Sequence, residues 1–273
     1  MNNKKKRIIL IGFIAFLIMI MVTIVYIGCR FINYEKMQNN NISNLTGQME
    51  YLQEKLEQIT DYYKYETDYK SSSYNYLALG NSLTLISTVG HGICSTRNNN
   101  DYVGLLVDYL QKNHMDENGV IFYRYNFSPW ERTADRGSTL DLIDPFLSPD
   151  LDLITIQLGE NASDLSTYEK DMEELIKYIK DAAPNAEIIV IGDFWNVKRN
   201  NMRRNAAKST SVKFADLSDI IGDNSYQSSV GIEFEKVDGS TEIVSEAAAT
   251  HPGDKGMKYI SEKVIEVMED TER

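Results

Sequence analysis

The chain has 273 residues, 42% of them hydrophobic, with 28 basic and 40 acidic side chains and a net charge of −12. This composition is typical of a globular chain and excludes a disordered or fibrous one. Five of the basic residues lie in residues 1–30, which contain no acid, so residues 31–273 carry 23 basic against 40 acidic residues. A surface this acidic repels phosphate backbones, which excludes nucleic acid as a partner.

Cysteine usage excludes two further classes of protein. Two cysteines cannot form a disulfide framework, and the Cys and His spacings of a structural zinc site are absent. We therefore expect no metal and no cofactor.

The N-terminal residues carry the pattern of a membrane span. No charged residue occurs between Ile8 and Gly28. As a helix these 21 residues would span about 31 Å, close to the ~30 Å hydrocarbon core of a bilayer. A basic tail, residues 1–7, precedes the span and is kept in the cytoplasm by the positive-inside rule. We predict a single-pass signal anchor over residues 8–29, with the remainder on the extracytoplasmic side of the cell membrane.

Two other interpretations of this segment stay open. A cleaved signal peptide would have an unusually long apolar region, and no Ala-x-Ala cleavage site follows it. Alternatively, lipidation occurs at Cys29, because residues 27–29 resemble the end of a lipobox, although Tyr26 replaces its usual small aliphatic residue. In all three cases the folded part works outside the cytoplasm.

We predict a stalk and linker over residues 30–73. Apolar residues recur there at alternating spacings of three and four for about three heptads, which is the pattern of a coiled-coil seam. The seam residues are Ile42, Leu45, Met49, Leu52, Leu56, Ile59 and Tyr63. One interpretation is an amphipathic helix packed on its own domain, and the other is a homodimer formed through residues 42–63.

The remaining residues, 74–273, alternate between strand and helix patterns. The predicted strands are residues 74–79, 120–127, 151–158, 187–191 and 212–217, and the predicted helices are 101–112, 168–183 and 253–269. Apolar strands separated by helices favour an α/β fold, a three-layer α/β/α sandwich around a parallel, flavodoxin-like sheet. In such sheets reactive residues lie at the carboxyl ends of the strands.

Ser82, Asn161 and Asp193 follow predicted strand ends, and a histidine precedes the last helix. Ser82 follows the first predicted strand in LGNSL (79–83), Asn161 follows another in LGEN (158–161), and His251 precedes the last helix in THPG (250–253). Each alone is more often structural than catalytic. Together they supply a nucleophile, an oxyanion donor and a base.

At these motifs the sequence resembles the SGNH (GDSL-type) hydrolases and acyltransferases. Their Gly-Asp-Ser-Leu block corresponds to GNSL (80–83), with Asn81 in place of the acid. Their Gly-x-Asn block corresponds to GEN (159–161), and their terminal Asp-x-x-His-Pro block to AATHP (248–252). The resemblance covers roughly residues 74–270 and leaves the anchor and the stalk unexplained.

The resemblance implies roles for individual residues. Ser82 would be the nucleophile and His251 the base, and the Ser82 N–H and the Asn161 amide would form the oxyanion hole. Gly137 is a candidate for the third donor, which the family takes from a second-block glycine. Alternatively, residues 126–131 line that side of the pocket.

The sequence departs from the family where the family has the aspartate that orients the histidine, because Ala248 stands there. Loss of that carboxylate from a Ser-His-Asp triad lowers kcat by about 10⁴. Three explanations stay open: another group orients His251, the chain is a binding-only relative, or the alanine is an introduced substitution. Candidate orienting groups are a backbone carbonyl, the side chains of Glu246 and Asp193, and the Trp195 backbone.

We also place Asn81, Glu160, Trp130 and Trp195 in the substrate-binding region, the tryptophans as platforms for a sugar ring. An aromatic side chain near a strand end is, however, more often part of the core. The predicted function is an extracytoplasmic serine esterase that removes O-acetyl groups from an envelope or extracellular glycan through an acyl-Ser82 intermediate. The alternatives are an O-acyltransferase using the same intermediate and a catalytically impaired glycan-binding relative.

Overall fold

The computed structural model describes residues 67–114 and 118–270. The chain divides into two units, Met1–Lys64 and Tyr65–Arg273, and the described residues all belong to the second. The predicted tail (1–7), anchor (8–29) and heptad segment (42–63) lie outside the described residues. In the described ranges no helix is both long enough and apolar enough to cross a bilayer.

Five parallel strands form the central sheet in the order β2-β1-β3-β4-β5. Their bounds are β1 Tyr74–Gly80, β2 Val120–Asn126, β3 Leu153–Gln157, β4 Glu187–Ile191 and β5 Lys213–Ala215. This is the flavodoxin-like strand order, so the predicted parallel α/β sheet is confirmed.

The strands form because their residues are apolar on both faces, as a sheet covered on both sides requires. Leu77 and Leu79 of β1 belong to the core on one face, and Tyr76 and Ala78 belong to the core on the other. All four side chains are fully buried. The alternation along one strand therefore supplies both hydrophobic cores.

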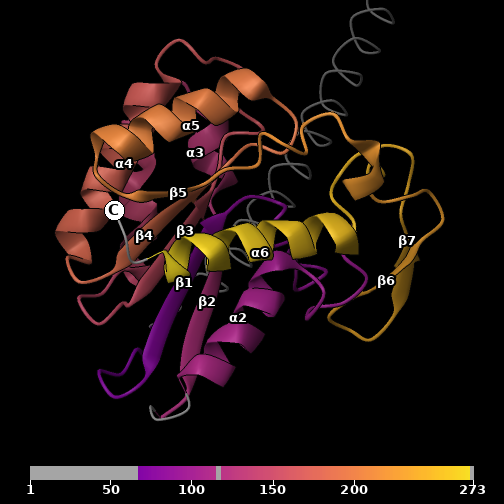
Figure 1. The fold of residues 1–273 in the computed structure, drawn as a ribbon, viewed down its shortest axis with the longest axis horizontal. Helices are drawn as coiled ribbons and strands as arrows, with labels where there is room; N and C mark the ends of the chain where they lie inside the picture. The colour runs from indigo at the N-terminus through magenta and orange to yellow at the C-terminus, as the bar shows by residue number, and fades with distance from the viewer. Residues whose placement is uncertain (1–66, 115–117, 271–273) are drawn as a thin grey trace, which may run out of the picture. The chain divides into compact units, whose positions relative to one another are not determined.

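Helices cover both faces of the sheet (Figure 1). On one face lie α2 (Tyr102–Asn113) and α6 (Asp254–Glu269), and on the other lie α3 (Ser128–Arg132), the 3-10 helix η1 (Gly137–Phe146), α4 (Tyr168–Ala182) and α5 (Val197–Ser209). The three predicted helices match α2, α4 and α6 to within two residues. The three-layer sandwich is therefore present as predicted.

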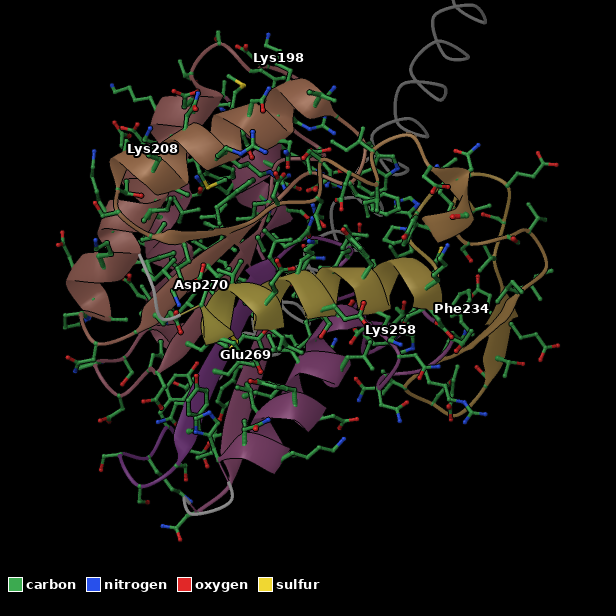
Figure 2. All side chains as sticks on the ribbon, viewed as in Figure 1. Lys198, Lys208, Phe234, Lys258, Glu269 and Asp270 are labelled. Atoms are coloured by element: carbon green, nitrogen blue, oxygen red, sulfur yellow. The ribbon has the colours of Figure 1, made fainter. Side chains whose placement is uncertain are left out.

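Helix α5 was not predicted from the sequence. Its inner side carries two alanines, but also the polar residues Asn200 and Arg203, both fully buried. Hydrophobic periodicity cannot detect a helix whose buried side is largely polar. The lysines at its two ends, Lys198 and Lys208, are exposed and lie on its outer side (Figure 2).

A small antiparallel hairpin, β6 (Glu233–Glu235) with β7 (Thr241–Ile243), lies apart from the main sheet and follows the 3-10 helix η2 (Asn224–Tyr226) (Figure 1). Phe234 marks it in Figure 2. The Glu235 N–H donates to the Thr96 carbonyl at 3.0 Å, and the Thr96 hydroxyl donates to Asp254 at the start of α6 at 2.6 Å. These contacts attach the hairpin beside the N-terminal end of α6.

Candidate active site

Ser82 lies on a tight turn directly after β1. Gly80 ends the strand between Asn126 of β2 and Gln157 of β3. A Cβ at Gly80 would overlap the Thr84 hydroxyl and lie 2.9 Å from the Gln157 carbonyl oxygen, so only glycine fits there. The following turn leaves Ser82 half-buried at the carboxyl edge of the sheet.

His251 lies in the loop before α6, and a backbone carbonyl orients its ring. Its Nδ1 lies 2.9 Å from the Ala248 carbonyl oxygen. Because a carbonyl can only accept, Nδ1 carries the hydrogen and Nε2 keeps a free lone pair. The carbonyl thus sets the tautomer that a general base requires, without an aspartate.

The surroundings of His251 favour its neutral form. Burial lowers the pKa of the imidazole below its ordinary value of 6.5, and the hydrogen bond to Ala248 opposes that shift only in part. The Trp195 ring packs edge-on against it with 5.4 Å between ring centroids. The Trp195 indole N–H donates to the Thr250 carbonyl at 3.0 Å, which ties this aromatic wall to the histidine loop.

One loop contacts both Ser82 and Ala248, the residue whose carbonyl orients His251. The Ile93 N–H donates to the Ser82 carbonyl at 2.8 Å, and the thiol of the next residue, Cys94, donates to the Ala248 carbonyl at 3.2 Å. The carbonyl that accepts from Cys94 is therefore the one that orients His251. These contacts connect the serine turn and the histidine loop, which are far apart in the sequence.

Two carboxylates were also considered for orienting His251: Asp193, which binds other partners, and Glu246. Asp193 is fully buried, and its carboxylate accepts from Arg199 at 2.6 Å and from the Trp195 N–H at 2.8 Å. Burial favours the neutral form of Asp193, but Arg203 and Arg199 outweigh it and lower its pKa. Glu246 is exposed.

Asn161 lies four residues after the end of β3 and has an exposed side chain, and its amide donates to a buried carboxylate. Its Nδ2 donates to Glu131 Oε2 at 2.5 Å. Glu131 is 1% exposed and also accepts from the Asn81 amide at 2.9 Å and from the Gly159 N–H. Glu131 thus connects the GNSL motif (80–83) to the GEN motif (159–161).

A buried ion-pair network extends from this point toward α5. Glu160 accepts from Asn81 at 2.7 Å and pairs with Arg203 at 2.8 Å, and Arg203 reaches Asp193 at 3.3 Å. Burial raises the pKa of Glu160, and the positive charge of Arg203 offsets that rise only in part. This network explains why α5 buries polar side chains.

Some predicted site residues have different roles in the structure. Trp130 is fully buried and packs edge-on against Tyr168 at 5.9 Å, so its predicted role as a sugar platform is wrong and it belongs to the core. Asn81 is 1% exposed, so it supports the site through hydrogen bonds and does not line it. Glu160 pairs with Arg203, and its role in substrate binding stays a prediction.

The structure leaves the other substrate and oxyanion candidates as predictions. Trp195 lies beside His251 and stays a candidate platform for substrate. Gly137 is an exposed residue at the start of η1, and its role as a third oxyanion donor stays a prediction. Glu131 belongs to the segment 126–131, which the sequence offered as an alternative lining for that side of the pocket.

Sequence reasoning missed two residues of the site. Glu131 contacts Asn81 and Asn161, which lie 50 and 30 positions away in the chain, and no local pattern marks such a pairing. Cys94 has a left-handed backbone with φ of 64° and a buried side chain, neither of which is visible in the sequence.

Comparison with known proteins gives similar solved structures. No protein-family model matches the sequence, and no curated protein matches it. A phospholipase A1 from Streptomyces albidoflavus is 14% identical, with 71% of this chain and 99% of that chain covered and a TM-score of 0.45. A two-domain esterase active on acetylated mannans is 14% identical, with 80% and 53% covered and a TM-score of 0.49. A member of the lipolytic G-D-S-L family from Veillonella parvula is 15% identical, with 72% and 99% covered and a TM-score of 0.43.

The topology positions the residues of the three motifs. The five parallel strands have the order β2-β1-β3-β4-β5, with Ser82 directly after the first strand, Asn161 after the third and His251 before the last helix. This arrangement agrees with the α/β/α fold expected from the sequence resemblance.

Proposed function

We propose that the protein is a serine esterase of the SGNH type that works through an acyl-Ser82 intermediate. One observation carries the proposal: the Ala248 carbonyl holds His251 Nδ1 at 2.9 Å, in a loop attached to the Ser82 turn through Ile93 and Cys94. This contact fixes the tautomer of His251, which is the role of the aspartate in the family. The pair Ser82 and His251 then acts as a dyad.

The reaction follows from these groups. His251 Nε2 takes the proton of the Ser82 hydroxyl as Oγ attacks the ester carbonyl carbon. The oxyanion that forms accepts hydrogen bonds from the Ser82 N–H and the Asn161 amide. The imidazolium gives its proton to the leaving alcohol, and the acyl group stays on Ser82. Water, deprotonated by His251, then releases the carboxylic acid and restores the serine.

We infer that the substrate is an O-acetyl ester on an envelope or extracellular glycan. Two features support this class: the sequence pattern of an N-terminal anchor, which directs the domain outward, and Trp195, an aromatic ring beside His251 that suits a sugar face. Transfer of the acyl group to a sugar hydroxyl uses the same intermediate, and the products distinguish it from hydrolysis.

The test uses the purified full-length protein with a chromogenic acetate ester and with an O-acetylated polysaccharide. We expect acetate release from both, and we expect the Ser82→Ala variant to lose at least about 10³-fold in rate. The exposed Ser166→Ala is the matched control and should keep full activity. Acetyl groups that move to a glycan hydroxyl instead of water would favour transfer. Equal turnover by the Ser82→Ala and parent proteins would overturn the proposal.

A further inference from the structure

The buried carboxylate of Glu131 accepts hydrogen bonds from three N–H donors, one of which is the Asn161 amide proposed for the oxyanion hole. Glu131 accepts from Asn81 Nδ2 at 2.9 Å, from Asn161 Nδ2 at 2.5 Å and from the backbone N–H of Gly159. All three contacts of this side chain are with donors, which suits an ionised carboxylate. Only 1% of Glu131 is exposed, so water does not compete for these contacts.

Both oxygens of Glu131 are in use. Oε1 accepts from Asn81 and Gly159, and Oε2 accepts from Asn161. A carboxylate accepts at both oxygens, whereas a glutamine accepts at one and donates at the other. The contact therefore determines that Nδ2, and not Oδ1, of Asn161 lies on this side. The second hydrogen on that nitrogen remains for an oxyanion, and the Asn161 side chain is exposed.

The same contacts explain why this chain has Asn81 where the family has an acid. The Asn81 Nδ2 lies 2.9 Å from Glu131 Oε1 and 2.7 Å from Glu160 Oε2. An aspartate at this position would place a third carboxylate against these two and would remove the N–H groups that now donate to both. Like charges at such distances in a buried site are strongly unfavourable.

We propose that Glu131 is a positioning residue for ester hydrolysis, which orients the Asn161 amide toward the oxyanion, and that Asn81 is the donor its carboxylate requires. The inference rests on the proposed function, because an oxyanion forms only if Ser82 attacks an ester. We therefore expect that replacing Asn81 by the family's aspartate lowers the stability of this protein.

The first arm of the test measures steady-state kinetics of the full-length protein with the acetate ester. Glu131→Gln keeps the shape of the side chain but removes one acceptor, so the Asn161 amide loses its fixed orientation. We expect kcat to fall roughly 10²-fold, the size of the loss of one oxyanion donor, with KM changed less than about twofold. The acid limb of the pH profile should not move, because His251 is untouched.

Two controls accompany this arm. The exposed Glu174→Gln should retain parental kinetics. Titration of Ser82 with a fluorophosphonate gives the concentration of competent sites, so a loss of folded protein is not mistaken for a fall in kcat. If Glu131→Gln keeps parental kcat per site, the positioning role is overturned while the esterase assignment stands.

The second arm measures thermal unfolding and needs no activity. We expect Asn81→Asp to lower Tm by roughly 5–10 °C, because it leaves three carboxylates in one buried cluster. The exposed Asn201→Asp, on the outer side of α5 beside Arg204, should leave Tm nearly unchanged. Adding Glu131→Gln to Asn81→Asp removes one of the three charges and should recover part of the lost Tm.

The two arms separate the possible failures. Additive effects of Asn81→Asp and Glu131→Gln on Tm would overturn the link between these residues, whatever the enzyme does. Ester turnover that does not depend on Ser82 would overturn the proposed function and, with it, the positioning role of Glu131. In that case non-additive effects of the two substitutions on Tm would still show that Asn81 and Glu131 are in contact.

Discussion

At the scale of single residues, the decisive group is the Ala248 carbonyl. It accepts from His251 Nδ1 at 2.9 Å, from the His251 backbone N–H at 2.9 Å and from the Cys94 thiol at 3.2 Å. A carbonyl fixes the tautomer of an imidazole as an aspartate does, but it carries no full charge to stabilise the imidazolium that forms during catalysis. Burial lowers the pKa of His251, and the hydrogen bond to this carbonyl opposes the shift only in part.

This lowered pKa predicts the pH dependence of the enzyme. The base works only as neutral imidazole, so the acid limb of kcat/KM, where His251 becomes protonated, should be centred below pH 6.5. Folding also releases a proton from this group, so its contribution to stability decreases as the pH falls below 6.5. A pH profile of kcat/KM for the acetate ester checks this. An acid limb centred above 6.5 would contradict it.

A carboxylate added at position 248 should improve the enzyme. In Ala248→Asp the new charge would stabilise the imidazolium, raise the pKa of His251 and move the acid limb to higher pH. Because the carbonyl already fixes the tautomer, we expect kcat to rise by about 10-fold, far less than the ~10⁴ lost when a triad loses its aspartate. Ala249→Asp is the matched control, with the charge one residue further along. An equal response of both variants would refute the specific role of position 248.

At the scale of elements, Asp101 joins a helix, a strand and the loop between Ser82 and Cys94. It is fully buried, and it caps α2 by accepting from the Gly104 N–H at 2.7 Å. It also accepts from the Gly92 N–H at 2.7 Å and pairs with Arg124 of β2. Its carboxylate therefore holds the loop that contacts both Ser82 and the histidine loop.

We expect Asp101→Asn to lower the free energy of unfolding by about 3 kcal/mol, because it leaves Arg124 buried without a counter-charge. Urea denaturation followed by circular dichroism measures the change. Asp108→Asn, on the exposed side of the same helix, should cost less than about 0.5 kcal/mol. Equal effects of the two substitutions would show that Asp101 is not a structural anchor.

The elements also show what the sequence could predict. The strand predicted at 187–191 has those bounds, and the strand at 74–79 is one residue longer, because both are short, largely apolar runs. Helix α5 escaped prediction because its buried side includes Asn200 and Arg203, whose partners Asp193 and Glu160 lie on other segments. The positions of Ser82, Asn161 and His251 followed from motifs, whereas Glu131 is recognisable only once β1 and β3 lie side by side.

At the scale of the whole molecule, the predicted anchor leads to a prediction about location. An uncharged run of 21 residues from Ile8 has the length and composition that predict a membrane span. We expect the full-length protein to stay with membranes after alkaline carbonate extraction, and a chain that begins at residue 67 to be released. Mass spectrometry of the membrane form distinguishes an intact N-terminus from one processed at Cys29. Release of the full-length protein by carbonate would contradict a membrane anchor.

The central claim is that Ser82 is a nucleophile activated by His251 without an aspartate. The most direct test is covalent trapping of the full-length protein with a fluorophosphonate, followed by peptide mass spectrometry. We predict a single adduct on Ser82, formed at least about 10²-fold more slowly in His251→Ala because the general base is lost. An adduct on another residue, or equal labelling of Ser82 with and without His251, would contradict the account.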